Sequence, residues 1–353
     1  MPVIVRGMEK QAKSIMPGIA MRRFREPPRM VSEHNVYKPR ERALGFYVQS
    51  MQRGQAAFDQ QLTTQPGCWG DGSCITKARA ACEQAVLPQA EALAQLAATA
   101  VDPATYATAL YRCLGMSTRA CVSITAANWA AMDPSNAVPW LHLANAAVER
   151  NDLAGRDEAL RRASALPVYD PRLPPVLRLT QADAVLAKPV PVRLTISFAL
   201  VNSYSTVKDL SPTSRLVGFC APAADAIPGR VETCSQLADK ILQQDDEING
   251  RLIGTALAGH AHWSAEKLAA LNDEHDAMVQ VVREGEYFPT SRLNCSGYEK
   301  FNLFVNEMAG VGMVAMLRQR IGASGKSIVV LAEVRRAAVR KQREEIEKAN
   351  AKK

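Results

Sequence analysis

Residues 133–166, DPSNAVPWLHLANAAVERNDLAGRDEALRRASAL, decide the fold class of this chain of 353 residues. Apolar residues recur at helical spacing on both sides of a polar turn near Asn151 and Asp152, which predicts two amphipathic helices. Asp133 followed by Pro134 is typical of a helix start, because Asp caps free N–H groups and proline fits the first turn. The stretch therefore predicts a helical hairpin.

The Asp-Pro pair occurs three times, at 102–103, 133–134 and 170–171, so the spacings are 31 and 37 residues. A period near 34 with two helices per unit resembles the tetratricopeptide repeat. Arg156 stands where that repeat has a small residue. Ordinary amphipathic hairpins would bury the same apolar residues, so both interpretations stay open. The expected repeat-packing residues are Trp140, Leu143, Ala144, Leu160 and Ala163.

Composition divides the rest of the chain, and we expect an all-α fold in which tetratricopeptide-like helical hairpins precede a helical C-terminal region. No apolar run reaches the roughly 18 residues of a membrane helix, so no transmembrane anchor is expected. The expected segments are a basic irregular arm (1–40), a helical repeat-like domain (41–170), a Pro-rich connection (171–191), a helical C-terminal domain (192–332) and a charged terminal helix (333–353). Helices are expected at 41–62, 75–100 (with a kink or break at Pro88), 232–256, 264–284, 297–321 and 327–350.

The net charge of +8 belongs to the two ends of the chain. Residues 1–42 hold ten basic and four acidic residues, and residues 333–353 hold eight and four. Basic ends can contact nucleic acid or an anionic membrane, and a solvated arm and helix is the simpler interpretation. The terminal helix lacks aromatic residues to stack on bases, so we expect no nucleic-acid partner.

Eight cysteines lie in the chain, and none forms the C-x2-C pair that is typical of structural zinc sites. The count is even and several of the cysteines lie close together in sequence, so disulfides are favoured over free buried thiols, and both over a metal site. Paired cysteines indicate an oxidising compartment, such as the periplasm or envelope of a bacterium, whereas free thiols would favour the cytoplasm. The candidate disulfide cysteines are Cys113, Cys121, Cys220, Cys234, Cys68, Cys74 and Cys82, and Cys295 is the candidate free thiol.

The stretch GASGKS at 322–327 is similar to the end of a phosphate-binding loop. The first glycine of that loop would fall at Arg320, and the preceding segment has the pattern of a helix rather than of a strand. We therefore predict a helix, turn and helix, with Gly322 ending the first helix, and expect no nucleotide. Nor do His260, His262 and the pair Glu274-His275 match a metal motif, so we expect no cofactor.

The order of features is similar to that of a known group of proteins. A Met132-Asp-Pro-x-Asn-Ala-x-Pro-Trp140 hairpin precedes Cys220 and Cys234, an Ile253-Gly254 helix, a Trp263-led helix and the late Cys295. This resembles uncharacterised proteobacterial helical proteins with degenerate tetratricopeptide-like repeats, and the resemblance implies a bacterial envelope setting.

These observations favour a non-enzymatic interaction or scaffold protein, in which stacked helical hairpins take a protein or peptide partner. Two alternatives stay open. One is an enzyme with an unrecognised thiol-based site, and the other is a basic-tailed adaptor for anionic surfaces.

Overall fold

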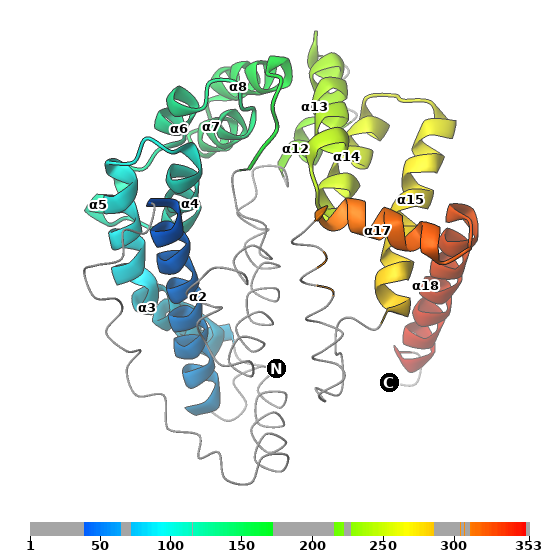
Figure 1. Cartoon of the computed structure of the whole chain (residues 1–353), viewed down its shortest axis with the longest axis horizontal. Coiled ribbons are helices and arrows are strands. Elements are labelled where there is room, and N and C mark those ends of the chain that lie inside the picture. The colour runs from blue at the N-terminus through cyan, green and yellow to red at the C-terminus, as the bar shows by residue number, and fades with distance from the viewer. Residues whose placement is uncertain are drawn as a thin grey trace. The chain divides into compact units, whose positions relative to one another are not determined.

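The computed structural model describes residues 39–64, 72–114, 116–171, 215–221, 227–285, 304, 307 and 311–350. These residues form helices joined by turns, with one isolated bridge between Asn136 and Val168 (Figure 1). The expectation of an all-α fold is thereby confirmed. The described residues belong to two compact units, one up to Ile124 and one from Thr125 onward.

The division between the units falls inside the segment 41–170, for which the sequence predicts one domain. The reason is that α8 (Leu153–Ala165) packs against α13 (Arg230–Gln244), which lies much later in the chain. The segments 1–38 and 172–214 lie outside the described residues, so the basic arm and nearly all of the Pro-rich connection stay predictions.

The first unit is built on a long pair of helices, α2 (Pro39–Thr64) and α3 (Gly72–Ala98). They approach closely at Gly54, where a Cβ atom would lie 2.8 Å from Cγ1 of Val86. The expected kink or break at Pro88 does not end α3, which continues through it. Helix α4 (Pro103–Cys113) packs on both, and α5 (Arg119–Val122) closes the unit.

The second unit is a series of helices in which neighbours pack on each other. The contacts run from α6 to α7, α8, α13, α14 and α15, and α15 then contacts both α17 and α18 (Figure 1). The helices not yet bounded are α6 (Ala126–Met132), α7 (Val138–Glu149), α12 (Leu216–Phe219), α14 (Ile248–His260), α15 (Ala265–Glu284), α17 (Met313–Ala323) and α18 (Ile328–Asn350).

The expected helix at 232–256 is wrong, because the chain breaks between α13 and α14 at Asp245, Asp246 and Glu247. Asp246 caps the start of a helix that lies much later in the chain, α17. Its carboxylate accepts hydrogen bonds from the amides of Met313 (2.9 Å) and Val314 (3.1 Å), the first residues of α17. This capping satisfies free N–H groups at the helix start. Consequently α17 begins at Met313 rather than continuing the helix expected over 297–321.

The GASGKS stretch forms the predicted helix, turn and helix. Helix α17 ends at Ala323, and Ser327 caps α18, its hydroxyl accepting from the amide of Val330 at 3.3 Å. The helix-ending glycine is Gly325, with φ of +67°, and not Gly322, which lies inside α17. A left-handed residue just beyond a helix is the usual position for such a glycine. A helix, not a strand, precedes the stretch.

Candidate functional site

The predicted repeat-packing residues all lie on the α7–α8 hairpin. Ala144, Leu160 and Ala163 are buried, whereas Trp140 and Leu143 are only partly buried. The Trp140 ring is covered by the Arg162 guanidinium, whose Cζ lies 4.8 Å from the ring centroid. Two further side chains, Leu141 of α7 and Trp129 of α6, are fully buried and are not among the predicted repeat residues. The helical spacing of the apolar residues around Leu141 is the sequence feature that predicts its burial.

The cysteines of the described residues pair in part as expected. Disulfides join Cys113 to Cys121 across the α4–α5 turn and Cys220 to Cys234 between α12 and α13. Cys74 is also disulfide-bonded. Cys68 and Cys295 lie outside the described residues. Two close cysteine pairs fit an oxidising envelope or periplasm.

The thiol of Cys82 is free. The prediction that Cys82 takes part in a disulfide is therefore wrong. Cys82 shares the continuous helix α3 with Cys74, and eight residues of helix place the two about 12 Å apart, beyond disulfide reach. The pKa of the Cys82 thiol is raised, mainly by burial. The charge of nearby Arg112 opposes this rise in pKa, and the charge of Glu83 adds to it. A thiol enzyme needs the opposite shift, toward the thiolate.

The Cys220–Cys234 disulfide adjoins an aromatic clamp. The Phe219 ring is flanked by the guanidinium groups of Arg156 and Arg230, whose Cζ atoms lie 5.0 Å and 4.4 Å from its centroid. Both arginines also bind Asp157 on α8, at 2.7 Å and 3.0 Å. Arg156, the residue that departs from the repeat pattern, thus links α8 to the α12–α13 region.

Glu274 lies where three helices meet. It accepts from the buried Arg251 of α14 and, at 2.8 Å, from Arg318 of α17. Arg251 also donates to the carbonyl of Leu242, so this buried cation is paired and hydrogen-bonded. The carboxylate of Glu274 is therefore structural.

No group of three His, Cys, Asp or Glu side chains that could hold a metal exists among the residues that the structure describes. His260 ends α14, and His262 follows in the turn, in a left-handed conformation with φ of +58°. His275 of α15 is half-buried, and burial lowers its pKa, an effect to which nearby Arg335 adds and which Asp276 opposes.

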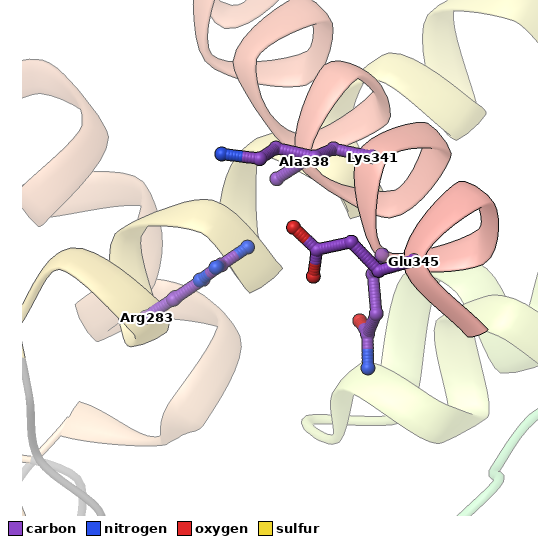
Figure 2. A pocket seen from close by; sticks show the side chains of 5 residues that line it. Arg283, Ala338, Lys341 and Glu345 are labelled. Atoms are coloured by element: carbon purple, nitrogen blue, oxygen red, sulfur yellow. The ribbon is translucent and has the colours of Figure 1, made fainter. Parts of the chain in front are cut away.

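Two hollows lie against α18, and they differ in charge. The larger, of about 420 Å³, is lined by Arg283 of α15 and by Ala338, Lys341, Gln342 and Glu345 of α18. Figure 2 shows Arg283 and Glu345 directed into the same space, with Lys341 on its far side. A carboxylate thus stands between two cations, which leaves one net positive charge in the lining.

The smaller hollow, of about 250 Å³, is lined by Asp276 of α15 and by five residues of α18. Four of these five are arginines and the fifth is apolar, so the hollow is strongly cationic. The sequence predicts the basic helix but does not predict this concavity, because the position of α15 beside the helix depends on tertiary packing. The five are Arg335, Arg336, Val339, Arg340 and Arg343.

None of the helices in the described ranges is long and apolar enough to cross a lipid bilayer. Comparison of the chain with protein families, with curated proteins and with solved structures finds no match.

Proposed function

We propose that the protein is a non-enzymatic scaffold that binds a protein or peptide partner on its helical hairpins. The observation that carries the proposal is the packing of α8 on α13, which sets the α7–α8 hairpin beside the α13–α14 hairpin. Stacked hairpins build an extended surface from many helices, the general means by which helical arrays bind partners. The tetratricopeptide-like character of the hairpins is part of this proposal.

The contacts between the two hairpins are polar and specific, which supports a fixed surface. Gln244 of α13 accepts from the amide of Tyr169 at 2.6 Å and donates to the carbonyl of Pro167 at 2.9 Å. Lys240 donates to the carbonyl of Leu166. These bonds hold the chain after α8 along α13. A rigid surface binds more tightly, because less conformational entropy is lost on association.

Each hairpin also carries a large apolar side chain in solvent. Leu153 at the start of α8 is 57% exposed, and Leu252 on α14 is 49% exposed. Single exposed apolar residues are common on protein surfaces, so exposure alone does not define an interface. Leu153 and Leu252 are therefore the positions chosen for substitution in the binding test.

The test uses the full chain as bait for an extract of its source cells, and then the purified captured protein in calorimetric titrations. We expect Leu153→Asp or Leu252→Asp to weaken binding at least tenfold, because a charge would be buried at the interface. Val101→Asp is the matched control, since Val101 is 93% exposed and belongs to the first unit, whereas both hairpins belong to the second. Equal binding by all three variants, with helical content unchanged, would overturn the proposal.

A further inference from the structure

The arginines of α18 are arranged on one flank of the helix. At 100° per residue, the spacing from Arg336 to Arg340 and Arg343 places these three side chains within about 60° of one another. Arg335 and Val339 complete the wall that faces α15, where Asp276 forms the opposite side of the 250 Å³ hollow.

The hollow has more positive charge than its acids neutralise. Arg336 donates to Asp276 at 2.7 Å and to Asp273 at 2.6 Å, so these two acids of α15 both bind the same arginine. Arg335, Arg340 and Arg343 have no carboxylate within ion-pair distance among the residues that the structure describes. His275, which lies near Arg335, has a pKa lowered mainly by burial and adds no negative charge.

Two glutamates on α18 could have neutralised this flank but do not. Glu344 and Glu347 follow Arg340 and Arg343 by four residues, a spacing at which ion pairs form on helices. Neither pair is present in the described helix. Three guanidinium groups therefore face a hollow and have no partner of opposite charge among the described residues.

The larger hollow, on the other flank of α18, serves as an internal comparison. It also holds two cations, Arg283 and Lys341, but Glu345 stands between them (Figure 2). An anion entering there would meet a free carboxylate. In the arginine-lined hollow the lining acid, Asp276, is already bound to Arg336. Only the second arrangement favours an anionic ligand.

We propose that the hollow lined by Arg335, Arg336, Arg340 and Arg343 binds a phosphate group, carried by a soluble compound or by a lipid headgroup. The planar guanidinium presents paired N–H donors that match phosphate oxygens two at a time. A volume of 250 Å³ equals the liquid volume of about eight waters, room for one phosphorylated headgroup. The lining contains no aromatic side chain, so it offers nothing on which a nucleic-acid base would stack.

The site lies on α15 and α18, so this inference is independent of partner binding by the hairpins. The first test titrates the full chain with pyrophosphate by calorimetry at low salt. We expect the double variant Arg340→Gln with Arg343→Gln to weaken binding at least tenfold. The control, Lys341→Gln with Lys348→Gln, removes the same charge from other faces of α18, and we expect a change below twofold. Equal loss in both double variants, or no loss in the first, would overturn the site.

The second test separates the two sources of phosphate and the competing class of ligand. Phosphatidylcholine vesicles containing phosphatidic acid are sedimented with the protein, with and without pyrophosphate. Vesicle binding that pyrophosphate displaces assigns the site to a lipid headgroup, whereas pyrophosphate binding without vesicle binding assigns it to a soluble phosphate compound. A 20-nucleotide single strand that binds more tightly than pyrophosphate, and equally well to both double variants, would contradict the proposal.

Discussion

Asn136 binds both backbone groups of Asp170, 34 positions later in the chain. Its Nδ2 donates to the Asp170 carbonyl at 2.6 Å, and its Oδ1 accepts from the Asp170 amide at 3.1 Å. The same side chain donates to Asp133 at 2.9 Å and accepts from the amide of Val138 at 3.1 Å. Every hydrogen-bonding position of this fully buried amide is used. The start of α7 is thereby fixed to the segment that follows α8.

Replacing Asn136 should therefore be costly. Asn136→Ala removes four hydrogen bonds and leaves Asp133, itself buried, without this donor, so we expect unfolding to become easier by about 2–4 kcal/mol. Chemical denaturation followed by circular dichroism measures the change. The control is Asn272→Ala, whose amide is exposed and donates only to the Leu268 carbonyl of its own helix, with a change of about 0.5 kcal/mol or less. Equal effects in the two variants would contradict the role of Asn136.

The local features of the fold were accessible from sequence, because their causes are local. Asp102 caps α4, its carboxylate accepting from the amides of Ala104 and Thr105, and Ser264 caps α15. Both follow from side chains that reach a backbone group two or three residues away. The cysteine pair Cys113 and Cys121 was predictable for the same reason, since a short turn brings them together.

The features that depend on distant packing were not accessible. Asp246 caps a helix 67 positions away, and Arg156 and Arg230 meet at Phe219 from separate parts of the chain. Nothing near these residues in sequence identifies their partners. Similarly, the arginines of α18 are evident from the sequence, but the hollow that they line exists only because α15 packs beside α18. Cys82 was misassigned because the sequence does not reveal that α3 is unbroken from Gly72 to Ala98.

The two described disulfides should differ in their contribution to stability. Cys220–Cys234 closes a loop of 14 residues and Cys113–Cys121 one of 8, so chain entropy predicts about 3 kcal/mol and roughly 2.5 kcal/mol. Double Cys→Ser variants, unfolded in denaturant without reductant, measure both values. Cys82→Ser is the control, and we expect it to cost less than about 1 kcal/mol because no bond is lost. Wild-type stability in the Cys220/Cys234 variant would contradict the bond.

Gly312 should tolerate no side chain. Its φ is +88°, and a Cβ atom would lie within 2.7 Å of all three carboxylate atoms of Asp246, which cap α17. We expect Gly312→Ala to cost at least about 2 kcal/mol, since it adds a steric clash and a lost cap to left-handed strain. Gly325→Ala isolates the strain, because Gly325 has φ of +67° and open space around it, and should cost about 1 kcal/mol. Thermal unfolding of both variants measures the stability that each one loses. A loss for Gly312→Ala that is equal to or smaller than the loss for Gly325→Ala would contradict the clash with Asp246.

Asp245 should make stability depend on pH. Burial raises its pKa from 3.8 to about 6, an effect that hydrogen bonds from the Glu247 amide and from Tyr169 partly offset. The folded state therefore binds this proton more tightly than the unfolded state, and the group's contribution is full below about pH 4 and is lost as pH rises through 6. Glu247, with its pKa raised to about 7 by burial, acts in the same direction. His142 opposes them between about pH 4 and 6.5, because burial lowers its pKa to about 4.

The variant Asp245→Asn isolates the first of these groups, because the amide keeps the shape and can still accept from the Glu247 backbone but does not ionise. Relative to wild type, we expect its free energy of unfolding to rise by up to about 3 kcal/mol between pH 4 and pH 7. Denaturant unfolding at intervals of half a pH unit measures the difference, with the exposed Asp239→Asn on α13 as the matched control. The expected control curve runs parallel to that of wild type. A constant difference between Asp245→Asn and wild type across this range would show that the Asp245 carboxyl ionises as readily in the folded protein as in the unfolded chain, and the buried acid at the α13–α14 break would then have no role in pH dependence.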